Sequence, residues 1–363
     1  MSKKAKISKK PAKRQLNFFM SIAIALSVAV AGYLIMTTKG AGFFASADPE
    51  SGTLSGNAKL VADTTAYGSK AIQFTEPVVV TPPPTTPPTP APTGSSTCPL
   101  PKYPTPSCAG LTTAKKATCT TFTTHSGDFS TTANSQTISC MKITGGIIIR
   151  NTGIKIRNVE VAGDVTGSGF TIEDSTVGPA SGCANNTEGY IGDINFTMSR
   201  VYLRNVSEGV RIGGSNSIIQ DSYLKLCNPN NSGAHADGIQ VYDAGPAKNI
   251  VINHNVVDMR GVIYVTAPIF IPTDRAEQGN DGLTATVTNN VVAGGGFGLQ
   301  MPGDRPMTLT AVTGNKVVDG TWEYDPIDVT CSRVGAWSGN AVVTFDFVAG
   351  TIIKTISALN ECA

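Results

Sequence analysis

Two acidic side chains and one histidine stand at spacings that could support chemistry. His235 and Asp237 belong to the segment HADGIQ, residues 235–240, and Glu208 opens the similar segment EGVRI, residues 208–212. Residues two apart on a strand project to the same side, so the imidazole could act as a general base beside the carboxylate. Carboxylates on neighbouring strands would lie about 5 Å apart, which suits the acid and nucleophile of a retaining glycoside hydrolase.

The same acidic residues allow two other interpretations. Glu188 opens a third segment of this kind, EGYIG, so three carboxylates would follow successive strands. Stacked carboxylates repel each other, and a hard cation such as Ca²⁺ would relieve the repulsion through oxygen ligands. Alternatively, all three acids lie at solvated turns and have no chemical role. We therefore take His235, Asp237 and Glu208 as the candidate catalytic residues, and Ca²⁺ as a cofactor that the acids could hold.

A second candidate site is a column of outward-facing side chains. If Val210 and Ile212 point into a core, Arg211 between them points outward. The outward column consists of the residues at the equivalent position of five successive segments: Arg211, Gln240, Phe270, Gln300 and Asp328. Planar amides and a guanidinium bind hydroxyl and carboxylate groups, and an aromatic ring packs on a sugar face, so the column suits polysaccharide binding. The alternative is an ordinary solvated sheet face.

These segments belong to a repeat. A glycine followed by alternating apolar residues recurs at 145–149, 188–192, 208–212, 237–241 and 297–301, and the beat continues without the glycine at 267–271 and 325–329. From Gly209 onward the intervals are 29, 30, 30 and 28 residues. Such a period predicts a solenoid in which every coil contributes several short strands.

A second repeated element places a polar turn between two apolar pairs. It occurs at residues 155–161, 171–177, 218–224, 251–257, 286–292 and 311–318. The turn position holds Asn158, Asp174, Asp221, His254 and Asn289. Parallel strands stack at about 4.8 Å, so polar side chains at such turns can form ladders. We therefore expect His254 to be a turn residue and not a catalytic one.

The repeat, its NVxV-like and DSxV-like turns and the HADGIQ segment resemble the right-handed parallel β-helix proteins of the pectate-lyase-like superfamily. The resemblance covers residues 115–350 and implies an all-β solenoid. The fold hosts lyases, hydrolases, epimerases and adhesins, so it does not imply one activity. The chain departs from the polygalacturonase-like hydrolases, because HADG resembles their NTD segment but their DD, GHG and RIK segments are missing.

The N-terminal residues predict a membrane anchor. Residues 1–15 contain seven Lys and Arg residues and no acid, and residues 16–36 form an uncharged apolar stretch of 21 residues. About 20 apolar residues cross a bilayer as a helix, and a basic flank stays in the cytoplasm. We expect a signal anchor (transmembrane helix) at 16–36, with the rest of the chain extracellular. A cut after Ala47, in the sequence Ala45-Ser46-Ala47, would make the protein secreted.

Two short segments precede the solenoid. Residues 47–75 resemble part of a β-sandwich carbohydrate-binding module, but they are too few for a complete sandwich, which needs about 100. Residues 76–97 form a Pro/Thr-rich linker, in which 77–92 contain eight prolines. Such a run favours extended polyproline II and predicts a semi-rigid stalk. The solenoid domain then occupies residues 98–363.

Eight cysteines fit an oxidising compartment. None of them forms a C-x-x-C pair, which argues against a zinc ribbon or a thioredoxin-type site. Proximity in the sequence favours the pairs Cys98–Cys108, Cys119–Cys140, Cys183–Cys227 and Cys331–Cys362, among the 105 pairings that eight cysteines allow. Disulfides form in oxidising compartments, so the four expected pairs agree with the extracellular location that the N-terminal residues predict.

Composition narrows the partners. The formal net charge is +2, but removal of the seven basic residues of the N-terminal arm leaves 21 Lys and Arg against 26 Asp and Glu. A mildly acidic body argues against nucleic-acid binding. We predict a membrane-anchored extracellular protein that binds, and could cleave, a polysaccharide or surface glycan. The alternative is a non-catalytic adhesin or structural envelope protein.

Overall fold

The computed structural model describes residues 58–62, 70–74, 98–186, 188–228, 236–241, 247–263, 265–272, 282–303 and 306–362. The chain divides into two compact units, Met1–Ala91 and Pro92–Ala363. In the first unit, β1 (Ala58–Ala62) and β2 (Lys70–Phe74) form an antiparallel pair, both within the predicted 47–75 segment. The basic arm, the apolar stretch 16–36 and the Pro/Thr-rich linker lie outside the described residues. Among the residues that are described, no helix is long and apolar enough to cross a membrane.

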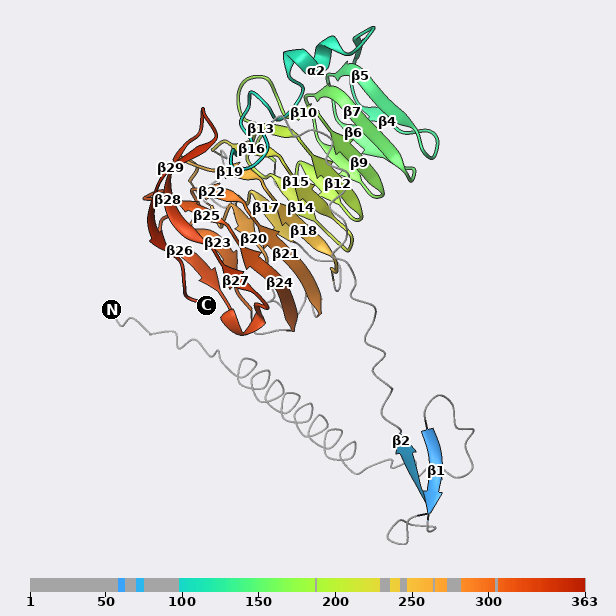
Figure 1. Cartoon of the computed structure of the whole chain (residues 1–363). Coiled ribbons are helices and arrows are strands. Elements are labelled where there is room, and N and C mark those ends of the chain that lie inside the picture. Colours follow the sequence, from blue (N-terminus) through green and yellow to red (C-terminus); the bar gives the residue numbers. More distant parts are fainter. Residues whose placement is uncertain are drawn as a thin grey trace, which may run out of the picture. The chain divides into compact units, whose positions relative to one another are not determined.

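The second unit is all-β apart from two short helical turns, and its strands stack in parallel along the chain (Figure 1). Within the described residues, nine strands form one sheet, which we call the narrow sheet. Its strands are β4 (Phe129–Ser130), β6 (Ile147–Ile149), β8 (Val165–Gly167), β11 (Ile191–Asp193), β14 (Val210–Ile212), β17 (Ile239–Val241), β20 (Ile269–Phe270), β23 (Phe297–Met301) and β26 (Asp325–Val329). The Gly-apolar repeat predicted seven of these strands, and β4 and β8 were missed.

The remaining described strands form a wide sheet to which most coils contribute two strands. They are β3 (Thr123–His125), β5 (Thr137–Ile143), β7 (Ile154–Val161), β9 (Phe170–Glu173), β10 (Thr176–Val177), β12 (Phe196–Ser199), β13 (Tyr202–Val206), β15 (Ile218–Gln220), β16 (Tyr223–Leu226), β18 (Ile250–Asn253), β19 (Val256–Asp258), β21 (Leu283–Thr288), β22 (Val291–Ala293), β24 (Met307–Thr313), β25 (Lys316–Val318), β27 (Trp337–Ser338), β28 (Ala341–Asp346) and β29 (Thr351–Ala358). Long parallel stacks of this kind are consistent with a β-helix, and we call residues 98–362 the solenoid.

At the corners between the paired strands of the wide sheet, the backbone adopts the left-handed conformation. Asp221, His254 and Asn289 have φ values of 52°, 55° and 55°, a conformation that short polar side chains tolerate best. His254 is therefore a corner residue, as predicted. Directly after the corner, Asn290 and Asn315 are fully buried, and the Asn290 Nδ2 donates to Asn315 Oδ1 at 3.0 Å. This asparagine ladder satisfies polar groups inside the coil, where an unpaired amide would be costly.

The interior of the solenoid is filled by the apolar residues that alternate with polar ones along each strand. Val210 and Ile212 are 1% and 0% exposed, whereas Arg211 between them is half-buried on the outer side. At the C-terminal end, β29 pairs with β28 in the antiparallel sense, and the short helix α2 (Thr113–Ala117) lies near the first coils (Figure 1). Four disulfides follow the pairing that sequence proximity favoured.

Candidate functional site on the narrow sheet

The outward column lies in register across the narrow sheet. Arg211 of β14 pairs with Gln240 of β17, and Gln240 pairs with Phe270 of β20. Phe270 in turn pairs with Gln300 of β23, and Gln300 with Asp328 of β26. The sequence had placed the same five residues in one column, and the placement is confirmed. Figure 1 shows β14, β17, β20 and β23 side by side.

Hydrogen bonding within the column is incomplete. The Gln300 amide Nε2 donates to Asp328 Oδ2 at 3.1 Å. The side-chain oxygens Gln240 Oε1 and Gln300 Oε1 are buried and accept no hydrogen bond within the described part of the chain. They flank Phe270 on either side. An unsatisfied buried acceptor is unfavourable unless water or a ligand donates to it, so both amides favour a ligand rich in hydroxyl groups.

The column continues toward the N-terminus into a pocket. Gly192 of β11 lies opposite Arg211, so the outer surface is hollow there. The hollow, which we call the Arg211 pocket, has a volume of about 260 Å³ and is lined by Thr166, Gly167, Glu188, Gly189, Gly192, Asp193, Arg211 and Gly213. Gly192 has φ +136°, and a Cβ there would collide with the Arg211 carbonyl oxygen. The sequence reasoning missed this extension because Gly192 precedes Arg211 by 19 residues, which breaks the beat of about 30.

An ion pair closes one side of the Arg211 pocket. The guanidinium Nη1 of Arg211 contacts Glu188 Oε2, and the two side chains are 21% and 82% exposed. A second hollow of about 240 Å³ adjoins the first and shares Glu188 and Gly189 with it. Asp164, Asn186 and Tyr190 line this second hollow. Together the hollows form a trough on the outer side of β8, β11 and β14.

Glu208 and Asp237 form a buried pair of carboxyl groups. They are 6% and 2% exposed, and the Asp237 backbone N–H donates to Glu208 Oε2 at 3.3 Å. Asp237 Oδ1 accepts from the Ala267 backbone N–H at 3.2 Å. Burial raises the pKa of Glu208 to about 7. Burial, and then the neighbouring Glu208, raise the pKa of Asp237 well above its ordinary value.

The third acid does not join this pair. Glu188 precedes Ile191 by three residues, whereas Glu208 precedes the paired Val210 by two. The shift by one residue puts Glu188 on the exposed side, where it contacts Arg211. The expected row of three carboxylates is therefore wrong, and the pair consists of Glu208 and Asp237.

The three histidines of the chain do not lie together in one described site. His235 lies outside the described residues, so its predicted position beside Asp237 stays a prediction. His254 is 4% exposed in its corner between β18 and β19 of the wide sheet, whereas the column belongs to the narrow sheet. Among the described residues, no group of three or more His, Cys, Asp or Glu side chains is arranged to hold a metal ion.

Polarity, register and a trough of glycines thus distinguish the outer side of the narrow sheet. It could bind an extended ligand that crosses the strands, with contacts spaced by one coil. The chain was compared with protein-family models, with curated proteins and with solved structures, and nothing matched. The geometry of the described residues is therefore the basis for any functional proposal.

Proposed function

We propose that the protein is an extracellular, membrane-anchored β-helix of the pectate-lyase-like kind that binds a polysaccharide along the outer side of its narrow sheet. The observation that carries the proposal is the in-register column from Arg211 to Asp328, which runs into the Arg211 pocket. Successive contacts about 4.8 Å apart approximate the rise of a glycan by one sugar unit, so a chain could lie along the stack.

The side chains of the column fit the chemistry of sugars. Phe270 is half-buried, with Gln240 and Gln300 on the neighbouring strands. A pyranose stacked on the ring would direct hydroxyl groups toward the two unsatisfied amide oxygens. Such hydroxyls are donors, which is what the two oxygens lack. This complementarity supports glycan binding over an unoccupied solvated face.

Binding is better supported than cleavage. A catalytic carboxyl group must touch the scissile bond, yet Asp237 is 2% exposed and Glu208 is 6% exposed. Both share the parity of the inward residues Val210 and Ile239, whereas Arg211 and its partner Gln240, which is 9% exposed, occupy the alternate positions. The raised pKa values fit a buried pair that has no cationic side chain in direct contact among the described residues. We therefore propose that the two acids have a structural role and that the ligand binds to the outward column.

Four disulfides support an oxidising compartment, and the apolar stretch 16–36 supports anchoring. Under this proposal the Pro/Thr-rich linker holds the solenoid away from the lipid surface. The class of protein is then an adhesin-like glycan binder. A polysaccharide lyase or glycoside hydrolase is the second candidate, supported by the closeness of Glu208 and Asp237.

Binding of the full-length protein to a panel of neutral and acidic polysaccharides tests the proposal. Phe270→Ala and Gln240→Ala should each weaken binding about tenfold or more, because each removes a stacking or hydrogen-bonding contact. Gln220→Ala is the matched control, since Gln220 is a half-buried glutamine of β15 in the wide sheet. Equal loss in the control, or no loss in the column variants, would remove the column as the binding surface.

A second measurement separates the binder from the enzyme. Reducing ends or unsaturated uronate products would be measured after incubation with the same polysaccharides. A binder gives no product, and the His235→Ala/Asp237→Ala double variant still binds. Product formation by the wild type that the double variant abolishes would establish the lyase or hydrolase instead.

A further inference from the structure

The N-terminal segment of the solenoid runs back over the wide sheet as a strap, which we define as residues 98–118. Its Tyr103 N–H donates to the Gly350 carbonyl at 2.8 Å, near the last strands. Further along, the Gly110 N–H donates to the Arg200 carbonyl at 2.8 Å, near the middle coils. Thr118 Oγ1 accepts from Asn158 Nδ2 at 3.3 Å, at the early coils. The strap therefore ties late coils to early ones.

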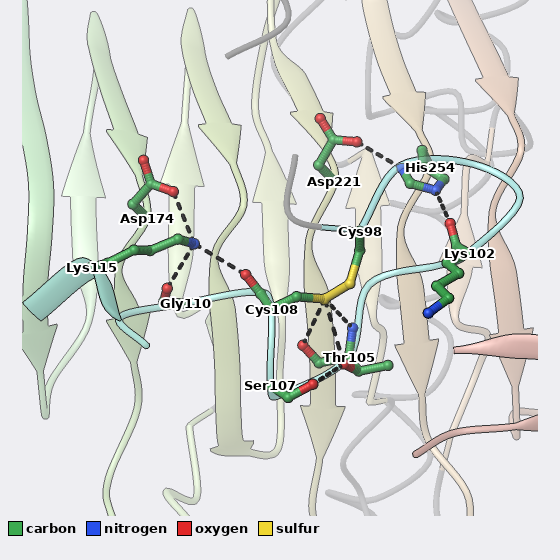
Figure 2. Close-up of a disulfide and its surroundings, with 10 residues drawn as sticks. All are labelled: Cys98, Lys102, Thr105, Ser107, Cys108, Gly110, Lys115, Asp174, Asp221 and His254. Carbon is green, nitrogen blue, oxygen red and sulfur yellow. Dashed lines mark hydrogen bonds and ion pairs between the residues drawn. A yellow bond between two sulfur atoms is a disulfide. The ribbon is translucent and has the colours of Figure 1, made fainter. Parts of the chain in front are cut away.

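Two nitrogen groups, the Lys115 ammonium and the His254 imidazole, join the strap to carboxylates at the corners of the wide sheet (Figure 2). The Lys115 ammonium lies 2.9 Å from Asp174 Oδ1 and donates to the Cys108 and Gly110 carbonyls at 3.1 and 3.0 Å. His254 lies with Nδ1 at 2.7 Å from Asp221 Oδ1 and with Nε2 at 2.8 Å from the Lys102 carbonyl. In both places the strap offers backbone carbonyls and the coil offers a carboxylate.

The two partners of His254 determine its protonation. A carbonyl oxygen can only accept, so Nε2 must carry a hydrogen to bond Lys102. A carboxylate also accepts, so Nδ1 must carry a hydrogen to bond Asp221. Asp221 keeps 22% of its side chain in solvent. The contacts thus require an imidazolium, since a neutral ring has one N–H and can serve one partner at a time.

We propose that His254 is a proton-dependent latch that holds the Lys102 part of the strap on the solenoid and releases it when the imidazole becomes neutral. The latch acts on residues 99–105, within the ring that the Cys98–Cys108 disulfide closes. Opening is therefore local, because the disulfide and the Lys115 contacts still hold the rest of the strap.

Among the described residues, one charged partner is in contact with the His254 ring. Asp221 comes from the corner between β15 and β16, and Asn289 of the next corner is uncharged. From the strap, the Tyr103 ring lies 5.4 Å from the imidazole between centroids, and burial raises the pKa of that phenol. The Lys102 amine points away from the imidazole in Figure 2. Phe345 of β28 packs edge-on against Tyr103 and carries no charge. Protonation of His254 is therefore coupled to Asp221 and to docking of the strap.

Linkage gives the direction of the effect. The docked strap prefers the protonated ring, so docking is favoured at low pH and weakens as rising pH removes the second proton. One charge-assisted hydrogen bond is worth about tenfold or more in an opening equilibrium. Amide exchange at Tyr103, corrected for intrinsic rates, should therefore accelerate about tenfold between about pH 5 and pH 8.5.

Hydrogen exchange of the full-length protein, followed for the Tyr103 amide against a core amide such as Ile252, tests the latch. His254→Asn retains a residue that suits the corner, because Asn289 occupies the same position with φ 55°. This variant should exchange fast at Tyr103 at both pH values. His125→Asn, which alters a histidine outside the latch, should behave like the wild type.

A wild-type strap whose exchange does not depend on pH, or one that His254→Asn leaves unchanged, would overturn the latch. If His254→Asn does not fold, Asp221→Asn provides a second variant, in which the amide can donate to a neutral Nδ1 and strap opening should no longer depend on pH. Nitrogen chemical shifts of His254 give an independent result. Two protonated ring nitrogens at about pH 5 are expected, and one protonated nitrogen there with a docked strap would contradict the assignment.

Discussion

The buried pair Glu208 and Asp237 makes the stability of the solenoid depend on pH in an unusual direction. The pKa of Glu208 rises from 4.5 to about 7 on folding, so the folded state holds a proton that the unfolded state releases. The stabilisation is complete below about pH 4.5 and is lost as the pH rises through about 7. A shift of this size corresponds to roughly 3 kcal/mol, and Asp237 adds to it with the same sign.

Glu208→Gln isolates this contribution because an amide is neutral at every pH and has nearly the same shape. At about pH 5 the variant and the wild type should unfold at similar urea concentrations. At about pH 8 the variant should be more stable by up to roughly 3 kcal/mol, since it no longer buries an ionised carboxylate. Urea unfolding of the full-length, oxidised protein, followed by tryptophan fluorescence and circular dichroism, measures the difference.

Glu188→Gln is the matched control, because Glu188 is 82% exposed and precedes the neighbouring strand β11 by three residues. Its stability difference from the wild type should not grow between pH 5 and pH 8 as that of Glu208→Gln does. A Glu208→Gln protein that is equally destabilised at both pH values would show that Glu208 is ionised and structurally required. That result would refute a protonated Glu208 in the folded state and would point to a cation beside the pair.

Three further predictions concern the corner, the ladder and the pocket. Asp174→Asn should destabilise the solenoid at neutral pH by about 3 kcal/mol and much less below about pH 3. Burial alone would raise the pKa of Asp174, but its bonds to Arg200 and Lys115 outweigh burial and lower it; urea unfolding at both pH values measures the change. Asn315→Ala should cost about 3 kcal/mol in the same assay, because it removes the acceptor of the Asn290 backbone N–H and leaves that group unpaired inside the coil. Gly192→Ala should cost about 1–3 kcal/mol and weaken glycan binding, since its Cβ would displace the Arg211 backbone; unchanged binding would show that the pocket is not used.

Much of the fold could be predicted because the repeat encodes the corner chemistry. Short polar residues adopt the left-handed conformation easily, and they mark most corners of the wide sheet. The coil of β12 and β13 was missed because its corner residue is Arg200, with φ 54°. Its guanidinium is held by Asp174 and Glu173 at 2.8 and 2.9 Å. Tertiary ion pairs stabilise a corner here that local preference would not indicate.

The candidate site was predicted only in part, because the sequence shows the alternation along one strand but not which strands pair. Alternation along a strand gave the outward column correctly, since it depends on local geometry alone. The same alternation puts Glu208 on the inner side, two positions before Val210, so a catalytic assignment for this acid conflicts with the parity that exposes Arg211. The Arg211 pocket depends on which strand lies opposite β14. That pairing joins coils of unequal length, which the sequence beat of about 30 residues could not show.

The two sheets differ in what their outer sides can offer a partner. On the wide sheet, outward residues such as Tyr223, Val256 and Val291 are buried in a second apolar cluster, to which the strap contributes Tyr103 and Ala109. A polymer could reach this surface only after the strap had left it. On the narrow sheet, the outward column is polar, and Arg211 is 21% exposed beside an open pocket. The strap thus covers the apolar outer side of the wide sheet. The outer side of the narrow sheet is then the surface on which a ligand could be recognised.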